Sequence, residues 1–158
     1  MNNSEASAFL LSVRPQFAER IYSGVKTLEI RKVAPLVSSG TVVLMYESGK
    51  QRKITGWFEL GGITWHSPDD LWNDFGSQTG LEESEFVEYC RDHDKVAALK
   101  VVKSGKFNSP LGLSDLRQVI PNFMPPQNFR YLKSLPEAFV EALRNLFLPT
   151  HLKLANSF

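Results

Sequence analysis

The chain has 158 residues, of which 42% are apolar and 22% charged, and its formal net charge is +1. This is the length of one ordinary domain with its own core, and the composition excludes a largely disordered chain. The single cysteine, Cys90, excludes an internal disulfide. No export signal and no membrane-spanning run is visible, so we expect a cytoplasmic protein without membrane contacts.

The small net charge conceals an uneven distribution of charged residues. Between His66 and Asp94 there are nine acidic residues and one basic residue, whereas the remainder carries seventeen bases and eight acids. A basic surface opposite an acidic helical region would attract a polyanion such as RNA. Ordinary solvated faces of mixed sign explain the same pattern equally well.

The first part of the chain is expected to alternate strands with one short helix. Pro15 suits the first position of a helix, and Phe17, Ala18 and Ile21 follow at helical spacing. Strands are expected where apolar residues run together or alternate with polar ones. The predicted elements are a strand over 8–13, a helix over 16–22, and strands over 27–31, 40–46 and 54–60.

The second part begins with helices and returns to strands. Ser67 followed by Pro68 and two acids is typical of a helix start, and Gly61-Gly62 indicates a turn. The predicted elements are helices from 67 and over 82–92, a strand over 95–102 with 105–111 beside it, a helix over 113–119, a last strand within 125–132, and an amphipathic helix over 136–147.

One ordered motif, Gly24-x-Lys26-x-x-Glu29-x-Arg31, follows the first strand and helix. This motif resembles the signature of the ASCH domain, a branch of the PUA-like superfamily, and the resemblance extends over about residues 8–132. It implies an α+β fold: a pseudo-β-barrel of about six strands, with helices inserted between strands and a C-terminal helix. We therefore expect a flexible N-terminus over 1–7, the domain over 8–132, and a helix and tail over 133–158 packed on it.

Polar residues in and near the motif form the candidate site. Glu29 and Arg31 project from one face of a strand, and Lys26 lies in the preceding turn. Arg31 could bind a phosphate with two hydrogen bonds, and tyrosines could stack on a nucleobase. The candidate catalytic residues are Lys26, Glu29 and Tyr46, and the candidate RNA- or nucleotide-binding residues are Arg14, Lys26, Arg31, Tyr46, Ser48, Lys53, Gln127 and Tyr131.

The same spacing allows a purely structural role, in which Glu29 pairs with Arg31 or Lys26 and no ligand binds. The three histidines are scattered and have no ligand spacing among themselves or with Cys90. We therefore expect no metal and no cofactor.

The resemblance implies a function in RNA metabolism, and two classes of function remain open. The first is a binding module for RNA or a modified nucleotide, with a regulatory role in RNA metabolism or transcription. The alternative is a small metal-independent hydrolase, either a ribonuclease or an acetylcytidine amidohydrolase. In the amidohydrolases a lysine, a threonine and a glutamate act together; Lys26 matches the lysine, but Glu29 stands in the place of the threonine. A protein partner could also bind the C-terminal helix, and the oligomeric state is not indicated.

Overall fold

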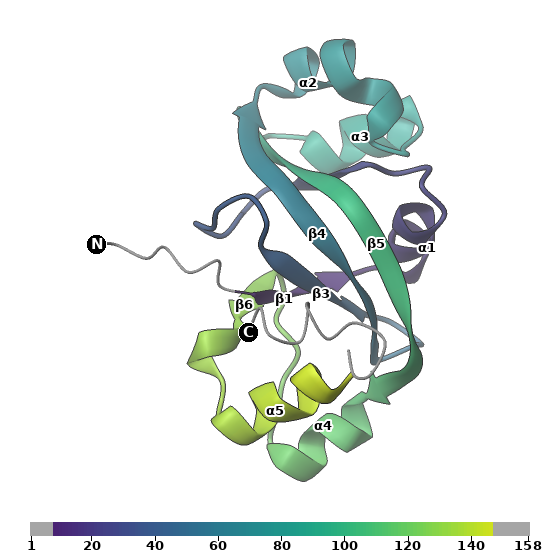
Figure 1. The fold of residues 1–158 in the computed structure, drawn as a ribbon. Coiled ribbons are helices and arrows are strands. Elements are labelled where there is room, and N and C mark those ends of the chain that lie inside the picture. Colours follow the sequence, from purple (N-terminus) through teal and green to yellow (C-terminus); the bar gives the residue numbers. More distant parts are fainter. Residues whose placement is uncertain (1–7, 147–158) are drawn as a thin grey trace, which may run out of the picture.

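The computed structural model describes residues 8–146, which form one six-stranded sheet with helices gathered at its two ends and one more helix, α1, packed against the sheet (Figure 1). The strands lie in the order β2-β5-β4-β3-β1-β6; β1 and β3 are parallel, and the other neighbours are antiparallel. Their bounds are Phe9–Val13 for β1, Leu28–Arg31 for β2, Val42–Glu47 for β3, Lys53–His66 for β4, Val96–Gly112 for β5 and Phe129–Tyr131 for β6.

The helices begin where the sequence supplies capping chemistry. Pro15 opens α1, where its missing N–H costs no hydrogen bond, and the hydroxyl of Ser67 accepts from the amide of Asp70 at the start of α2. The bounds are Pro15–Tyr22 for α1, Pro68–Phe75 for α2, Glu83–Cys90 for α3, Leu113–Val119 for α4 and Glu137–Asn145 for α5, with short 3-10 helices η1 at Gly76–Gln78 and η2 at Leu132–Ser134.

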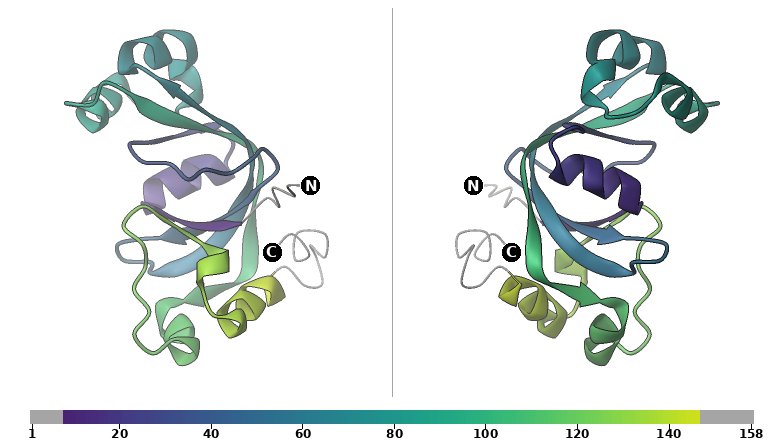
Figure 2. Two further views of the ribbon diagram at one scale, coloured as in Figure 1. Left: turned by 90° about the vertical axis from the view of Figure 1, so that its left-hand side faces the viewer. Right: turned by 90° about the vertical axis from the view of Figure 1, so that its right-hand side faces the viewer.

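The sheet curls, so that the side views show α1 on its concave side, α2 and α3 at one end and α4 and α5 at the other (Figure 2). Alternating residues of β1 and β3 serve two apolar clusters. Leu10 and Leu44 belong to the cluster that includes α4 and α5, whereas Leu11 and Met45 belong to the cluster that includes α1. A third cluster joins α2 and α3 to β2 and β5. The acidic helical pair is therefore an insertion that packs on β2 and β5 through a cluster separate from the other two.

The strands β4 and β5 are longer than the sequence suggested. Gly61 and Gly62 lie within β4, where the register with β5 shifts, so the predicted turn at this position is wrong. The separate strand predicted over 105–111 is wrong as well, because β5 runs without interruption from Val96 to Gly112. Bulges let a strand absorb extra residues and bend, which is how this pair continues around the curled sheet.

The predicted fold class is confirmed: a curled, half-barrel sheet of six strands with inserted helices and a C-terminal helix. Phe139 and Leu143 of α5 pack in the same cluster as β1 and β3. The predicted flexible N-terminus over 1–7 and the tail after 146 lie outside the described residues. Within residues 8–146 no helix is long and apolar enough to span a bilayer.

Candidate functional site

A cleft of about 890 Å³ lies where the parallel strands β1 and β3 end. Its walls come from five parts of the chain: the start of α1, the strand β2, the β3–β4 hairpin, the helix α3, and the segment from α4 to Asn128. The volume is within the range of about 300–1,000 Å³ that small-ligand pockets occupy. Its lining is more basic than acidic: the bases are Arg14, Lys26, Arg31, Lys32, Arg52 and Arg117, and the acids are Glu29, Glu85 and Glu88.

Lys26 is the most deeply placed base of the cleft, with only 1% of its surface exposed. Its ammonium donates a hydrogen bond to the carbonyl of Thr79 at 2.7 Å, and it lies 5.6 Å from the ring centre of Phe17. Burial lowers the pKa of Lys26 below its ordinary value of 10.5; Glu29 opposes this shift, and Arg20 and Arg31 add to it. Within residues 8–146 the bond to Thr79 is the only hydrogen bond of this ammonium, which leaves two of its three hydrogens for a ligand.

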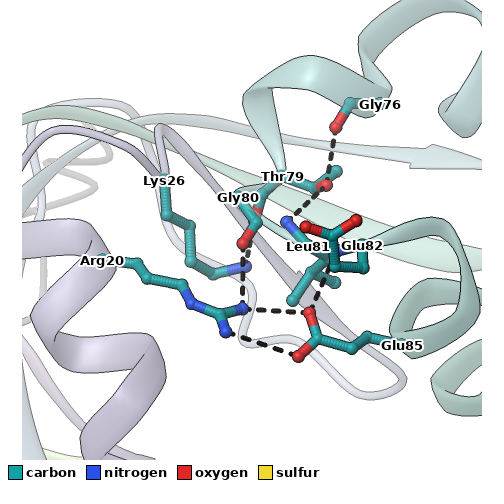
Figure 3. A network of polar contacts seen from close by, with 8 residues as sticks. All are labelled: Arg20, Lys26, Gly76, Thr79, Gly80, Leu81, Glu82 and Glu85. Atoms are coloured by element: carbon teal, nitrogen blue, oxygen red, sulfur yellow. Dashed lines mark hydrogen bonds and ion pairs between the residues drawn. The ribbon is translucent and has the colours of Figure 1, made fainter.

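A polar network ties the turn before α3 to α1 (Figure 3). Arg20 donates to the carbonyl of Gly80 at 2.9 Å and to both oxygens of Glu85, at 3.0 and 3.4 Å. The hydrogen bond from Arg20 lowers the pKa of Glu85, and the amide of Glu82 adds to this effect. These contacts hold the insertion against α1 and so fix one wall of the cleft.

Gly80 brings this turn close to Lys26. Its φ of +64° is readily adopted by glycine but costs other residues energy, and a β-carbon added here would lie 2.7 Å from the β-carbon of Lys26. The adjacent Thr79 is fully buried and its hydroxyl donates to the carbonyl of Gly76 at 2.7 Å. Both residues therefore help to place the carbonyl that holds Lys26.

Glu29, on β2, is 4% exposed and lines the same cleft. Its Oε2 is buried and has no hydrogen-bond partner among the described residues. Glu29 affects the pKa of Lys26, yet no pair of their charged atoms lies within 4.0 Å. The structural pairing of Glu29 with Lys26 or Arg31, which the spacing allows, is thus not formed, and both Glu29 and Lys26 line the cleft.

Arg31 is committed to the backbone on both sides of the cleft. Its guanidinium donates to the carbonyl of Ser12 at 2.9 Å and to that of Asn128 at 3.3 Å. The hydroxyl of Ser12 in turn donates to the carbonyl of Pro126 at 2.5 Å. Arg31 therefore anchors the loop before β6 to β1, besides contributing charge to the cleft.

Arg14 and Arg52 are exposed, line the cleft, and make no side-chain hydrogen bond or ion pair within residues 8–146. The backbone at Arg52 has a φ of +52°, an uncommon conformation for a residue other than glycine. Its carbonyl accepts a hydrogen bond from Leu113, the first residue of α4. Two arginine side chains are therefore available for an anionic ligand.

The remaining sequence candidates divide between the cleft and the outside. Tyr46, Ser48 and Gln127 line it, whereas Lys53 and Tyr131 do not. Tyr46 is only 3% exposed and packs in the core cluster, so its ring has no open face for stacking; its hydroxyl makes no hydrogen bond within residues 8–146. Tyr131 accepts a hydrogen bond from the amide of Leu36 at 2.8 Å.

Several cleft residues were not identified from the sequence. Phe17 and Tyr89 provide half-buried aromatic rings, and Arg52 and Arg117 provide charge. They come from a helix, the insertion, a hairpin and α4, so no local spacing connects them. Tyr89 lies close enough to Arg31 and Glu29 for both to affect its pKa, which burial raises above 10.0. In the part of the chain that the structure describes, no group of three or more His, Cys, Asp or Glu residues is arranged to hold a metal ion.

Comparison with known proteins gives a family match and a similar curated protein. A family model described as a domain of unknown function, DUF365, matches residues 7–121. A protein named ASCH domain-containing ribonuclease from Zymomonas mobilis is 27% identical over 124 residues, which cover 78% of this chain and 83% of that protein.

Solved structures agree with these matches. The crystal structure of ASCH from Zymomonas mobilis has a TM-score of 0.78 at 26% identity, covering 87% of this chain and 93% of that one. The structure of its tyrosine-to-phenylalanine variant has the same TM-score at 25% identity, covering 87% of this chain and 96% of that one.

Proposed function

Because this chain belongs to the ASCH domain family, we propose that it binds RNA in the cleft and cleaves it as a ribonuclease. The observation that carries the proposal is the cleft itself, which is lined by six bases and three acids, and in which Arg14 and Arg52 make no hydrogen bond or ion pair within residues 8–146. Phosphate groups supply most of the affinity in RNA binding, and arginine is suited to them because its planar fork makes two parallel hydrogen bonds. The ribonuclease named among the relatives supports RNA as the anion.

The chemistry needs charge at the phosphate and a group that transfers a proton. When the ribose 2′-oxygen attacks phosphorus, the new O2′–P bond forms, the P–O5′ bond breaks, and the 5′-oxygen leaves with a proton. We assign that proton to the hydroxyl of Tyr46, which lines the cleft and makes no hydrogen bond within residues 8–146. The proton of the 2′-hydroxyl passes to water. Arg14 and Arg52 stabilise the negative charge of the phosphate.

RNA binding is tested by the salt dependence of the affinity. Each phosphate contact that is removed should reduce the slope of log K against log salt by about 0.7 for a single strand. We expect Arg14→Gln and Arg52→Gln each to lower the slope for an unstructured RNA by about that amount. Arg130→Gln, an exposed base on β6 outside the cleft, is the control and should leave the slope unchanged. Equal slopes in all four proteins would exclude the cleft as the RNA site.

Cleavage is tested with Tyr46→Phe, which removes the hydroxyl and keeps the packed ring. We expect cleavage of unstructured RNA to fall by about 10²–10⁴-fold while binding is retained, as for loss of an acid-base group. Tyr22→Phe is the control, because its hydroxyl bonds to Thr55 at 2.7 Å away from the cleft. Acetylcytidine is offered to the same preparations. If it is hydrolysed and RNA is not, the ribonuclease proposal is wrong.

A further inference from the structure

Glu29 and Lys26 form a pair of buried, oppositely charged groups that do not satisfy each other. No charged atoms of the two approach within 4.0 Å, and the buried Oε2 of Glu29 has no hydrogen-bond partner among the described residues. A buried carboxylate without partners is costly, and nearly all buried polar groups are paired. The arrangement is therefore incomplete without a ligand.

The hydrogen-bonding groups that Glu29 and Lys26 leave unused in the cleft define the ligand that can bind there. Glu29 offers two acceptor oxygens, neither bonded within residues 8–146, and Lys26 offers the two N–H groups that its bond to Thr79 leaves free. A complementary ligand presents two adjacent donors followed by an acceptor. The Watson–Crick edge of guanine has this pattern, because its N2–H and N1–H are donors beside the O6 acceptor.

The other bases satisfy the pair less well. Cytosine and adenine each bring one amino group to Glu29, and uracil brings one N–H, so each leaves a carboxylate oxygen unpaired. Phe17 also lines the cleft, and the ammonium of Lys26 and the guanidinium of Arg20 lie over its ring, 5.6 and 5.4 Å from the ring centre, so the ring helps to hold Lys26 in place. We propose that the pocket between Glu29 and Lys26 selects guanine in RNA, with the carboxylate on N1–H and N2–H and the ammonium on O6.

This inference rests on the proposed function, since it names the base that the RNA-binding cleft recognises. It is tested with 2′-fluoro trinucleotides, which lack the attacking hydroxyl, of sequence UGU, UIU, UAU and UCU, by isothermal titration calorimetry. Inosine differs from guanine only by the missing 2-amino group, so it removes one of the two hydrogen bonds to Glu29. We expect UGU to bind about tenfold or more tightly than UIU, and UAU and UCU to bind more weakly than UGU.

The matching variant is Glu29→Gln, which has nearly the same shape but only one acceptor and places an N–H against an N–H of guanine. We expect it to bind UGU no better than the wild type binds UIU. Glu59→Gln, which alters a carboxylate paired with Lys103 outside the cleft, should leave all four affinities unchanged. Circular dichroism of each variant verifies the fold, and the wild-type comparison of UGU with UIU needs no variant.

Equal binding of UGU and UIU by the wild type, or a guanine preference that survives in Glu29→Gln, would overturn the inference, as would absence of binding to all four trinucleotides. The ribonuclease proposal is judged separately on all-ribose UGU. Guanine preference without cleavage supports this inference and contradicts the ribonuclease reading, whereas cleavage without guanine preference does the reverse.

Discussion

Replacing Gly80 by alanine should destabilise the protein by about 2–5 kcal/mol, through two separable effects. At a φ of +64° a residue with a β-carbon loses about 1–2 kcal/mol relative to glycine. The added carbon would also lie 2.7 Å from the β-carbon and 3.1 Å from the α-carbon of Lys26, where ordinary contacts begin at 3.4 Å. Overpacking of this kind costs about 1–3 kcal/mol.

The matched control is Gly24→Ala. Its φ is +83°, so the backbone effect is similar, but a β-carbon there meets no atom within 4 Å. Urea unfolding followed by tryptophan fluorescence gives the unfolding free energy of each variant, and equal m-values validate the comparison. We expect the loss in Gly80→Ala to exceed that in Gly24→Ala by about 1–3 kcal/mol. Equal losses would refute the close approach of the turn to Lys26.

Two further predictions concern ionisation. Since burial lowers the pKa of Lys26, the unfolded chain binds more protons than the folded one between that lowered pKa and 10.5. The wild type should therefore gain unfolding free energy relative to Lys26→Met as the pH rises through this window; a pH-independent difference contradicts the assignment. In Arg20→Gln the pKa of Glu85 should rise toward 4.5 in an NMR titration, whereas Arg91→Gln, which alters the separate pair with Glu88, should not change it. If the pKa of Glu85 is the same in Arg20→Gln as in the wild type, the hydrogen bonds from Arg20 to Glu85 are refuted.

Much of the fold follows from local patterns that survive in the structure. Alternation over 27–31 gives β2, and the Ser67-Pro68 signal gives the start of α2. Local patterns did not predict that β4 and β5 each continue as one long strand. Gly62, with a φ of +128°, and the run around Gly105 look like breaks in the sequence. In the structure Gly62 lies in a register shift between the paired residues Leu60 and Ile63, and Gly105 pairs with Trp57, so both stay within strands through the pairing of β4 with β5.

The candidate site was predictable only where its residues lie close together in the sequence. Lys26, Glu29 and Arg31 stand at fixed spacings in one motif, so a resemblance could identify them together. Phe17 and Tyr89 come together only through tertiary packing of α1 and the insertion. The role of Arg31 was also incomplete from sequence, because its two carbonyl partners belong to segments 19 and 97 residues away.

Two properties at position 52 favour different residues: the left-handed backbone favours glycine, whereas the cleft there gains a positive charge only from a cationic side chain. Glycine would relax the left-handed backbone there by about 1 kcal/mol but would remove the guanidinium from the cleft. Any other cation would keep the charge and the strain together. A lineage selected for folding alone would therefore tend to replace arginine by glycine or asparagine at this hairpin. Retention of arginine there would mark selection for holding an anion.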